Sequence, residues 1–168
     1  PAKRDYLEMV ANTVITRDMI DRYDIRNEEV FRGVINVLCS SIGSAVSPNR
    51  IANTLQSSGY KSVDNETVSR YLQHIVDAFL FYKVERYDLK GRAYLKTQNK
   101  YYACDMGLRN ALIQYRQLEV SRAIENIVYV ELVRRGYVVD IGKNRNEEID
   151  FVARDAEGRK NYIQVTYS

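Results

Sequence analysis

The sequence predicts an α+β fold, with a helical half to about residue 90 followed by a half built on a small sheet. Three observations predict it. Apolar residues recur at helical spacing from residue 28 to residue 79. From residue 81 the apolar pattern changes to period two, interrupted by turn residues. Helical spacing then returns between residues 105 and 136, and alternating segments follow to residue 167.

The first helices are indicated by periodicity. Residues 5–24 contain no glycine or proline, alternate in charge, and predict a connecting helix. The next predicted helix runs from about Glu28 to Ser41, and its buried stripe consists of Phe31, Val34, Ile35, Leu38 and Ile42. Cys39 falls on the same stripe, so we expect it in the core rather than in a catalytic role.

Two further helices follow with clear start and stop signals. Ser47 is placed to cap a helix that has Pro48 at its first position and Gly59 just past its end. Asp64 or Asn65 can cap the next helix. We expect its core face to consist of Val68, Leu72, Ile75, Val76 and Phe79, and its opposite face of Glu66, Ser69, Arg70, Gln73 and Asp77. His74, the single histidine, is expected at the edge of that face.

A basic hairpin comes next in the sequence. Runs around 81–87, 92–95 and 100–104 predict strands, with Lys90-Gly91 as the first turn. Three helices followed by such a hairpin is the element order of a winged helix. This interpretation assigns nucleic-acid contacts to the fourth predicted helix and to the wing, through Asn65, Ser69, Arg70, Gln73, Lys90, Arg92 and Lys96. A plain protein-interaction module stays open, because Glu66 and Asp77 on the same helix face would repel phosphate.

The last third of the chain predicts two helices and three strands. A long helix, "SRAIENIVYVELVRRG", is apolar around most of its circumference, so we expect it to be buried on several sides, and it carries Glu125. The strands are "YVVDIG", "EIDFVA" and "NYIQVTY". A turn at Ala156-Glu157 would place Asp150 across from Gln164 and Glu148 across from Thr166 on one face of the sheet, with Ile149, Phe151, Ile163 and Val165 on the other. Glu125, Asp150 and Gln164 would then form an oxygen-rich site suited to Mg²⁺ or Mn²⁺, with Glu125 and Asp150 as metal ligands.

At "RYDLKGRAYLKTQNKYYACDMGLRNAL", "ENIVYVELVRRGY", "EEIDFVA" and "YIQVTYS" the sequence resembles the C-terminal domain of unknown function of bacterial and archaeal AAA+ ATPases predicted from sequence. That domain is grouped with the PD-(D/E)xK restriction-endonuclease-like fold. The resemblance implies that Glu125 is the helix acid, Asp150 the hairpin acid, and Gln164-Val165-Thr166 the (D/E)xK tripeptide. The tripeptide lacks its lysine, for which Lys160 or Lys143 could substitute.

These expectations divide the chain into a connector at 1–27 leading from an upstream ATPase module, a winged-helix-like domain at 28–90, and an incomplete endonuclease-like domain at 91–168. The leading hypothesis is a non-enzymatic module that binds nucleic acid or a partner and couples it to the ATPase. The alternatives are a metal-dependent nuclease of degenerate motif and a protein-interaction or oligomerisation module.

Cofactors and location follow from the same hypothesis. We expect no cofactor in these residues unless the nuclease site uses Mg or Mn, and ATP only in the upstream module, since no G-x-x-x-x-G-K-[ST] loop occurs in the sequence. The absence of an initiator methionine favours a fragment. No apolar run is long enough to span a membrane, so we expect a cytoplasmic protein, with a homo-oligomer favoured by an open sheet edge at Tyr162–Tyr167.

Overall fold

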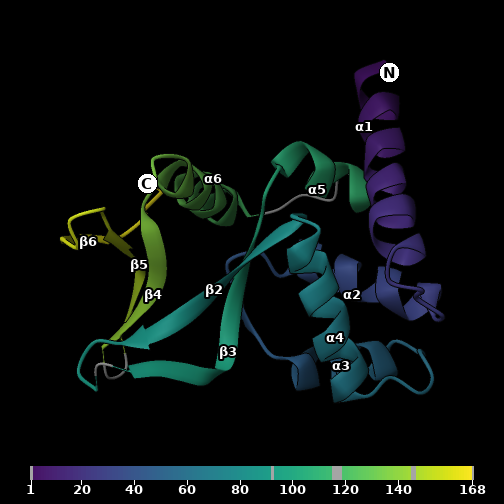
Figure 1. Cartoon of the computed structure of the whole chain (residues 1–168), viewed down its shortest axis with the longest axis horizontal. Coiled ribbons are helices and arrows are strands. Elements are labelled where there is room, and N and C mark those ends of the chain that lie inside the picture. The colour runs from purple at the N-terminus through teal and green to yellow at the C-terminus, as the bar shows by residue number, and fades with distance from the viewer. Residues whose placement is uncertain (1, 92, 115–118, 145–146, 168) are drawn as a thin grey trace. The chain divides into compact units, whose positions relative to one another are not determined.

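The computed structural model describes residues 2–91, 93–114, 119–144 and 147–167, and has an α+β fold (Figure 1). Its residues form two compact units. The first comprises Pro1–Ser41, Val46–Tyr82 and Ala103–Gln117, and the second Ile42–Ala45, Lys83–Tyr102 and Leu118–Ser168. These units do not follow the boundaries predicted at residues 27 and 90, because the strands around residues 81–103 divide between them.

The first unit is helical. Helix α1 (Ala2–Thr13) continues into the π-helical segment η1 (Val14–Asp21) where a single connecting helix was predicted. Helices α2 (Glu28–Ser40), α3 (Pro48–Ser57), α4 (Asn65–Asp77) and α5 (Met106–Leu112) follow. Helix α2 packs against α3, α4 and α5, while α1 packs against α5. The core of this unit therefore centres on α2, as its predicted stripe required: Phe31, Val34, Leu38 and Cys39 are fully buried.

Local capping explains where these helices begin. The side chain of Ser47 accepts a hydrogen bond from the amide of Arg50 at 3.2 Å, and Pro48 occupies the first turn. Asp64, and not Asn65, caps α4 by accepting from the amide of Thr67 at 2.7 Å. The predicted core position of Phe79 is wrong: α4 ends at Asp77, and Phe79 is 77% exposed with a positive φ of 55°.

The sheet belongs mostly to the second unit and has six strands in the order β1-β3-β2-β4-β5-β6. Their bounds are Ala45–Val46, Ala93–Ala103, Phe81–Asp88, Val138–Asn144, Glu147–Arg154 and Lys160–Ile163, in the same order. Where two separate strands were predicted, around 92–95 and 100–104, the structure has the single strand β3. Strand β2 pairs in parallel with β4 through Arg86 and Ile141, so the hairpin and the C-terminal strands share one sheet.

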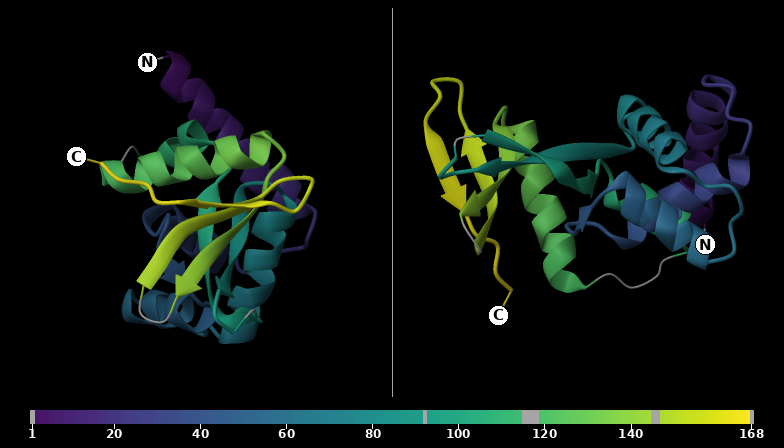
Figure 2. Two further views of the ribbon diagram at one scale, coloured as in Figure 1. Left: turned by 90° about the vertical axis from the view of Figure 1, so that its left-hand side faces the viewer. Right: turned by 90° about the horizontal axis from the view of Figure 1, so that it is seen from below.

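Helix α6 (Val120–Arg134) packs against β4 and β5 (Figure 2). The ring centroid of Tyr129 on this helix lies 4.5 Å from that of Tyr102 and 5.8 Å from that of Phe151. The prediction that α6 is buried on several sides is wrong, because only Asn126 and Tyr129 are buried among its residues and Ile127 is 58% exposed. The helix therefore covers the sheet with one face and presents apolar residues on the other.

Candidate functional site

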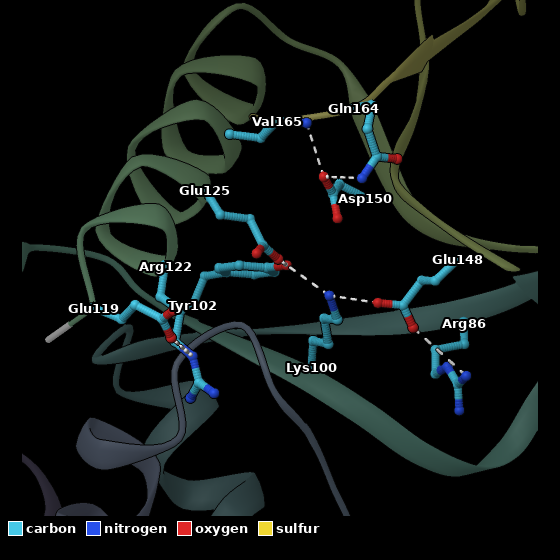
Figure 3. Close-up of polar contacts among 10 residues, drawn as sticks. All are labelled: Arg86, Lys100, Tyr102, Glu119, Arg122, Glu125, Glu148, Asp150, Gln164 and Val165. Carbon is cyan, nitrogen blue, oxygen red and sulfur yellow. Dashed lines mark hydrogen bonds and ion pairs between the residues drawn. The ribbon is translucent and has the colours of Figure 1, made fainter. Parts of the chain in front are cut away.

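The second unit holds a group of four charged residues and one tyrosine, which we call the Lys100 cluster: Arg86, Lys100, Tyr102, Glu125 and Glu148 (Figure 3). Nζ of Lys100 lies 3.1 Å from Oε1 of Glu125 and 2.7 Å from Oε1 of Glu148. The hydroxyl of Tyr102 donates a hydrogen bond to Oε1 of Glu125. Lys100 thus joins the helix acid to an acid on β5.

The five members of the cluster come from four elements, with Arg86 on β2, Glu125 on α6, Glu148 on β5 and the other two on β3. Lys100 and Tyr102 are two residues apart on β3 and therefore share a face of that strand. Glu125 lies on α6, one turn before Tyr129. The backbone of Gly43 lies next to the Glu125 carboxylate. The φ of Gly43 is 70°, and a Cβ at this position would lie 3.2 Å from Oε2 of Glu125. A side chain at position 43 would therefore displace the Glu125 carboxylate.

The electrostatics of the cluster are those of a partly dehydrated ion triad. Lys100 is 5% exposed. Burial by itself lowers the pKa of its ammonium, but the adjacent Glu125 and Glu148 carboxylates outweigh burial and raise that pKa. Burial, together with the negative charge of Glu125, also raises the pKa of Tyr102. Both groups are therefore held in their protonated forms at neutral pH.

A β-bulge in β5 turns Glu148 toward this cluster. Asp140 of β4 pairs with Val152, but Gly142, two residues on, pairs with Ile149, three residues back along β5. The extra residue interrupts the alternation of β5. Glu148 consequently reaches the side of the sheet occupied by Phe151, where Lys100 and Tyr102 lie. The prediction that Glu148 faces away from Phe151 is therefore wrong, because it assumed an unbroken period of two.

Asp150 and Gln164 lie together as predicted. Nε2 of Gln164 and the backbone amide of Val165 each donate to Oδ2 of Asp150 at 2.8 Å. The register of β5 with β6, in which Phe151 pairs with Ile163, leads to this arrangement. The predicted partnership of Glu148 with Thr166 is not formed, since β6 ends at Ile163 and Glu148 contacts Lys100.

The carboxylates of this region do not form a ready metal centre. Within the described ranges, no group of three or more His, Cys, Asp or Glu side chains is close enough to hold an ion. Glu125 is bonded to Lys100 and Tyr102, and Asp150 is bonded to Gln164 and Val165. The proposed ligands Glu125 and Asp150 would have to give up protein partners before accepting a divalent cation.

The lysine that contacts the helix acid Glu125 is Lys100, and not one of the two named from the sequence as possible substitutes. Nζ of Lys160 lies 5.3 Å from the ring centroid of Tyr87, and Lys143 pairs with Glu148 only through the β4–β5 backbone register. Lys100 contacts both glutamates instead. The sequence offers only a weak signal for it, which is a lysine directly before Tyr101 and Tyr102 in a predicted strand.

The predicted nucleic-acid residues of α4 share an exposed face. Asn65, Ser69, Arg70 and Gln73 are all exposed. Nε2 of Gln73 donates to Oδ1 of Asp77 at 2.8 Å, so that amide is partly engaged. His74 lies at the edge, as expected, where its ring stacks on Tyr23 with centroids 3.9 Å apart.

The predicted wing residues lie at the β2–β3 turn. Lys90 is exposed, and its amide and that of Gly91 donate to Oδ1 of Asp88 at 3.0 and 3.1 Å. Arg92 lies outside the described residues, as does the side chain of Lys96, whose backbone belongs to β3. Lys100, farther along β3, is buried and contributes little charge to the surface.

Comparisons with known proteins give the family. The family described as "Domain of unknown function (DUF8612)" matches residues 1–119. An uncharacterised protein of Haemophilus influenzae is 39% identical over 167 residues, covering 99% of this chain and 41% of its own length. An uncharacterised protein of Methanocaldococcus jannaschii is 28% identical over 169 residues, covering 98% of this chain and 37% of its own length.

The chain therefore spans about two fifths of the length of these relatives. The comparison with solved structures gave no match. In the described part of the chain, no helix combines the length and apolar character that crossing a membrane requires. On the match to residues 1–119, the chain belongs to the DUF8612 domain family.

Proposed function

We propose that this chain is a non-enzymatic, nucleic-acid-binding module of a larger ATP-hydrolysing protein. The observation that carries the proposal is the Lys100 cluster. A lysine ammonium occupies the space between Glu125 and Glu148, the position in which a nuclease would hold a divalent cation among carboxylates. The charges of the site are thus largely satisfied by the protein itself.

The element order supports the nucleic-acid part of the proposal. Helix α2 is followed by the short strand β1, then by α3, α4 and the β2–β3 hairpin, and β1 neighbours β3 in the sheet. This order is typical of a winged helix, whose last helix commonly meets the nucleic acid. The exposed face of α4 offers Arg70 for phosphate contact and the short polar side chains of Asn65 and Ser69 for hydrogen bonding.

Two observations support the larger assembly. The relatives are more than twice as long as this chain, so they contain further segments. The succession of α6, β4, β5 and β6, with Glu125 on the helix and Asp150 beside Gln164, is consistent with the resemblance to the restriction-endonuclease-like domain of AAA+ ATPases. In that setting this chain would couple contact with nucleic acid to ATP hydrolysis elsewhere in the protein.

Fluorescence anisotropy with labelled duplex DNA and RNA tests the proposal. We expect the affinity to fall at least about tenfold between roughly 50 and 200 mM salt, because phosphate contacts release counterions. Arg70→Gln should weaken binding, whereas Arg17→Gln, which removes another exposed charge from η1, should not. No binding at low salt to either nucleic acid would leave the protein-interaction module as the better hypothesis.

A metal-dependent nuclease is the second candidate, and one observation favours it. Glu125, Lys100 and Asp150 face one region although they come from α6, β3 and β5 (Figure 3). Lys100 would then supply the cation that Thr166 does not. Calorimetric titration with Mg²⁺ and Mn²⁺, with a plasmid-nicking assay alongside, separates the candidates. If the wild-type protein binds the metal and nicks the plasmid, and Asp150→Ala does neither, the chain is a nuclease and the non-enzymatic proposal is refuted.

A further inference from the structure

The first unit contains a cavity of about 420 Å³ beside the exposed face of α4. It is formed where the chain leaves η1 and approaches α2, and where α4 passes that connection. The residues that matter to its chemistry are Tyr23, Asp24, Arg26, Arg70, Tyr71 and His74. None of them belongs to the Lys100 cluster, so this cavity is separate from the site described above.

The cavity has an excess of positive charge. Arg26 and Arg70 are both exposed, and within the described ranges neither guanidinium forms an ion pair. Asp24 is the one acid among the lining residues. Two guanidinium groups without a carboxylate partner are well suited to an oxyanion, because each presents a planar fork of N–H donors.

One wall of the cavity is aromatic. The rings of Tyr23 and His74 stack with an interplanar angle of 16°. Nδ1 of His74 is buried and has no hydrogen-bond partner in the described structure, so the ring is positioned by stacking. Burial lowers the pKa of His74, and the opposing charges of Asp77 and Arg70 act on it as well. The imidazole therefore adds a flat, mostly neutral surface next to two cations.

The backbone that presents these groups is constrained. Asp24 adopts a positive φ of 47°, which is uncommon for a residue other than glycine. The amides on either side are bonded back into the preceding segment, from Tyr23 to Met19 and from Ile25 to Ile20. This reversal at Asp24 lets Tyr23 and Arg26 line the same cavity. Such a conformation costs free energy and is found preferentially at binding sites.

We propose that this cavity binds a nucleotide, with its phosphate on Arg26 and Arg70 and its base against the Tyr23–His74 stack. The choice of a nucleotide over other phosphate esters rests on the proposed function. A phosphate supplies the charge that two arginines match, and a base supplies a ring for the aromatic wall. The nucleotide is either free or one unit of a bound strand, and these two sources are distinguished by the experiment below.

His74 is the only histidine of the sequence, so its imidazole resonances in an NMR spectrum need no assignment. We would titrate the protein with inorganic phosphate, adenosine monophosphate and a short oligothymidylate while following these resonances. We expect the nucleotide to move them in a saturable way and to raise the pKa of His74, because a bound anion favours imidazolium. Inorganic phosphate should act more weakly, since it lacks a base.

The variant Arg26→Gln/Arg70→Gln should lower the affinity for adenosine monophosphate at least about tenfold. The matched control Arg17→Gln/Lys61→Gln removes two charges from exposed positions outside the cavity and should change the affinity less than about twofold. All four positions are exposed, so circular dichroism should show every variant folded. An equal loss in both variants would mean general electrostatic attraction, and would overturn the inference.

The three probes also separate this inference from the proposed function. If oligothymidylate shifts the His74 resonances with a higher affinity than adenosine monophosphate does, the ligand is a strand. If only adenosine monophosphate shifts these resonances, the ligand is a free nucleotide. If neither compound shifts them, there is no nucleotide site here, and the inference fails. Duplex binding measured by anisotropy on the same sample then decides independently whether the proposed function survives.

Discussion

Nζ of Lys100 lies 2.7 Å from Oε1 of Glu148, although β2 and β4 stand between their strands in the order of the sheet. This ion pair is the shorter of two that Lys100 forms, since its Nζ also lies 3.1 Å from Oε1 of Glu125. Arg86 adds a second cation, 3.6 Å from Oε2 of Glu148. A lysine buried to this extent is stable in its charged form only because both carboxylates are present.

Replacing Lys100 with methionine should therefore destabilise the fold. The substitution keeps an unbranched apolar side chain one atom shorter than lysine. It leaves Glu125 and Glu148, whose side chains are 14% and 32% exposed, without their ammonium partner. We expect a loss of about 3 kcal/mol in the free energy of unfolding at neutral pH, measured by urea denaturation.

Lys83→Met is the matched control for this variant. Lys83 also pairs with a glutamate, Glu85, but at 3.6 Å and with side chains 37% and 50% exposed. An exposed pair of this kind contributes less than about 1 kcal/mol. Similar losses for the two variants would show that burial of Lys100 carries no special energetic weight.

The stability of the protein should fall in alkaline solution, in part through Tyr102. Burial and the negative charge of Glu125 raise the pKa of this tyrosine, whereas in the unfolded chain it titrates near its ordinary value of about 10. Its contribution is therefore complete below about pH 10 and is lost as the pH rises, by up to about 1.4 kcal/mol per pH unit. The raised pKa of Lys100 acts in the same direction.

The variant Tyr102→Phe tests this assignment. In urea denaturation between about pH 9 and 11.5, the free energy of unfolding of this variant should fall less steeply with pH than that of the wild-type protein. The lost hydrogen bond to Glu125 lowers the free energy of unfolding at every pH and does not affect this comparison of slopes. Tyr167→Phe, at a position 66% exposed, should leave the slope unchanged. An identical slope in all three proteins would contradict the role given to Tyr102.

Asp150 should hold the end of the hairpin in place. Its Oδ2 accepts from the amide of Val165 at 2.8 Å, beyond the last residue of β6. In Asp150→Ala we expect the Val165 amide to exchange its hydrogen at least about tenfold faster, because a charge-assisted bond is lost. Asp150→Asn keeps an acceptor oxygen and should show a smaller increase. Native hydrogen exchange followed by NMR measures both, and equal rates in the alanine variant and wild type would contradict the prediction.

Cys39 should resist thiol reagents in the folded protein. It has no exposed surface, and burial raises the pKa of its thiol to about 12. In a Cys104→Ser variant, which leaves one cysteine, Ellman's reagent at about pH 8 should react slowly with the native protein and promptly after addition of urea. Prompt reaction without urea would show that α2 opens far more readily than its packing indicates.

Several features could be predicted from the sequence because they depend on neighbours along the chain. Ser47 and Asp64 cap helices through amides three residues away, and the buried stripe of α2 follows from its own periodicity. The pairing of Asp150 with Gln164 follows from the turn at Ala156 and Glu157 that joins their strands. In each case the interaction closes within a single element or a single hairpin.

The role of Lys100 was not predictable in the same way. Its position in a predicted strand of the basic hairpin does not indicate which acids it meets, and the structure buries it against Glu125 and Glu148. The bulge in β5 was equally hidden, because the residues from Glu148 to Phe151 alternate as an ordinary strand would. Which face Glu148 occupies depends on how β5 aligns with β4.

The sequence by itself determined the α+β class, the helix starts, the hairpin and its acid–amide pair, since short-range hydrogen bonds and periodicity specify them. Only the tertiary structure decided which charges meet. A lysine on β3 can neutralise acids on α6 and β5 only after the sheet and helix have assembled around it. Burial then makes that pairing energetically necessary, because an isolated charge in such a place would be too costly to keep.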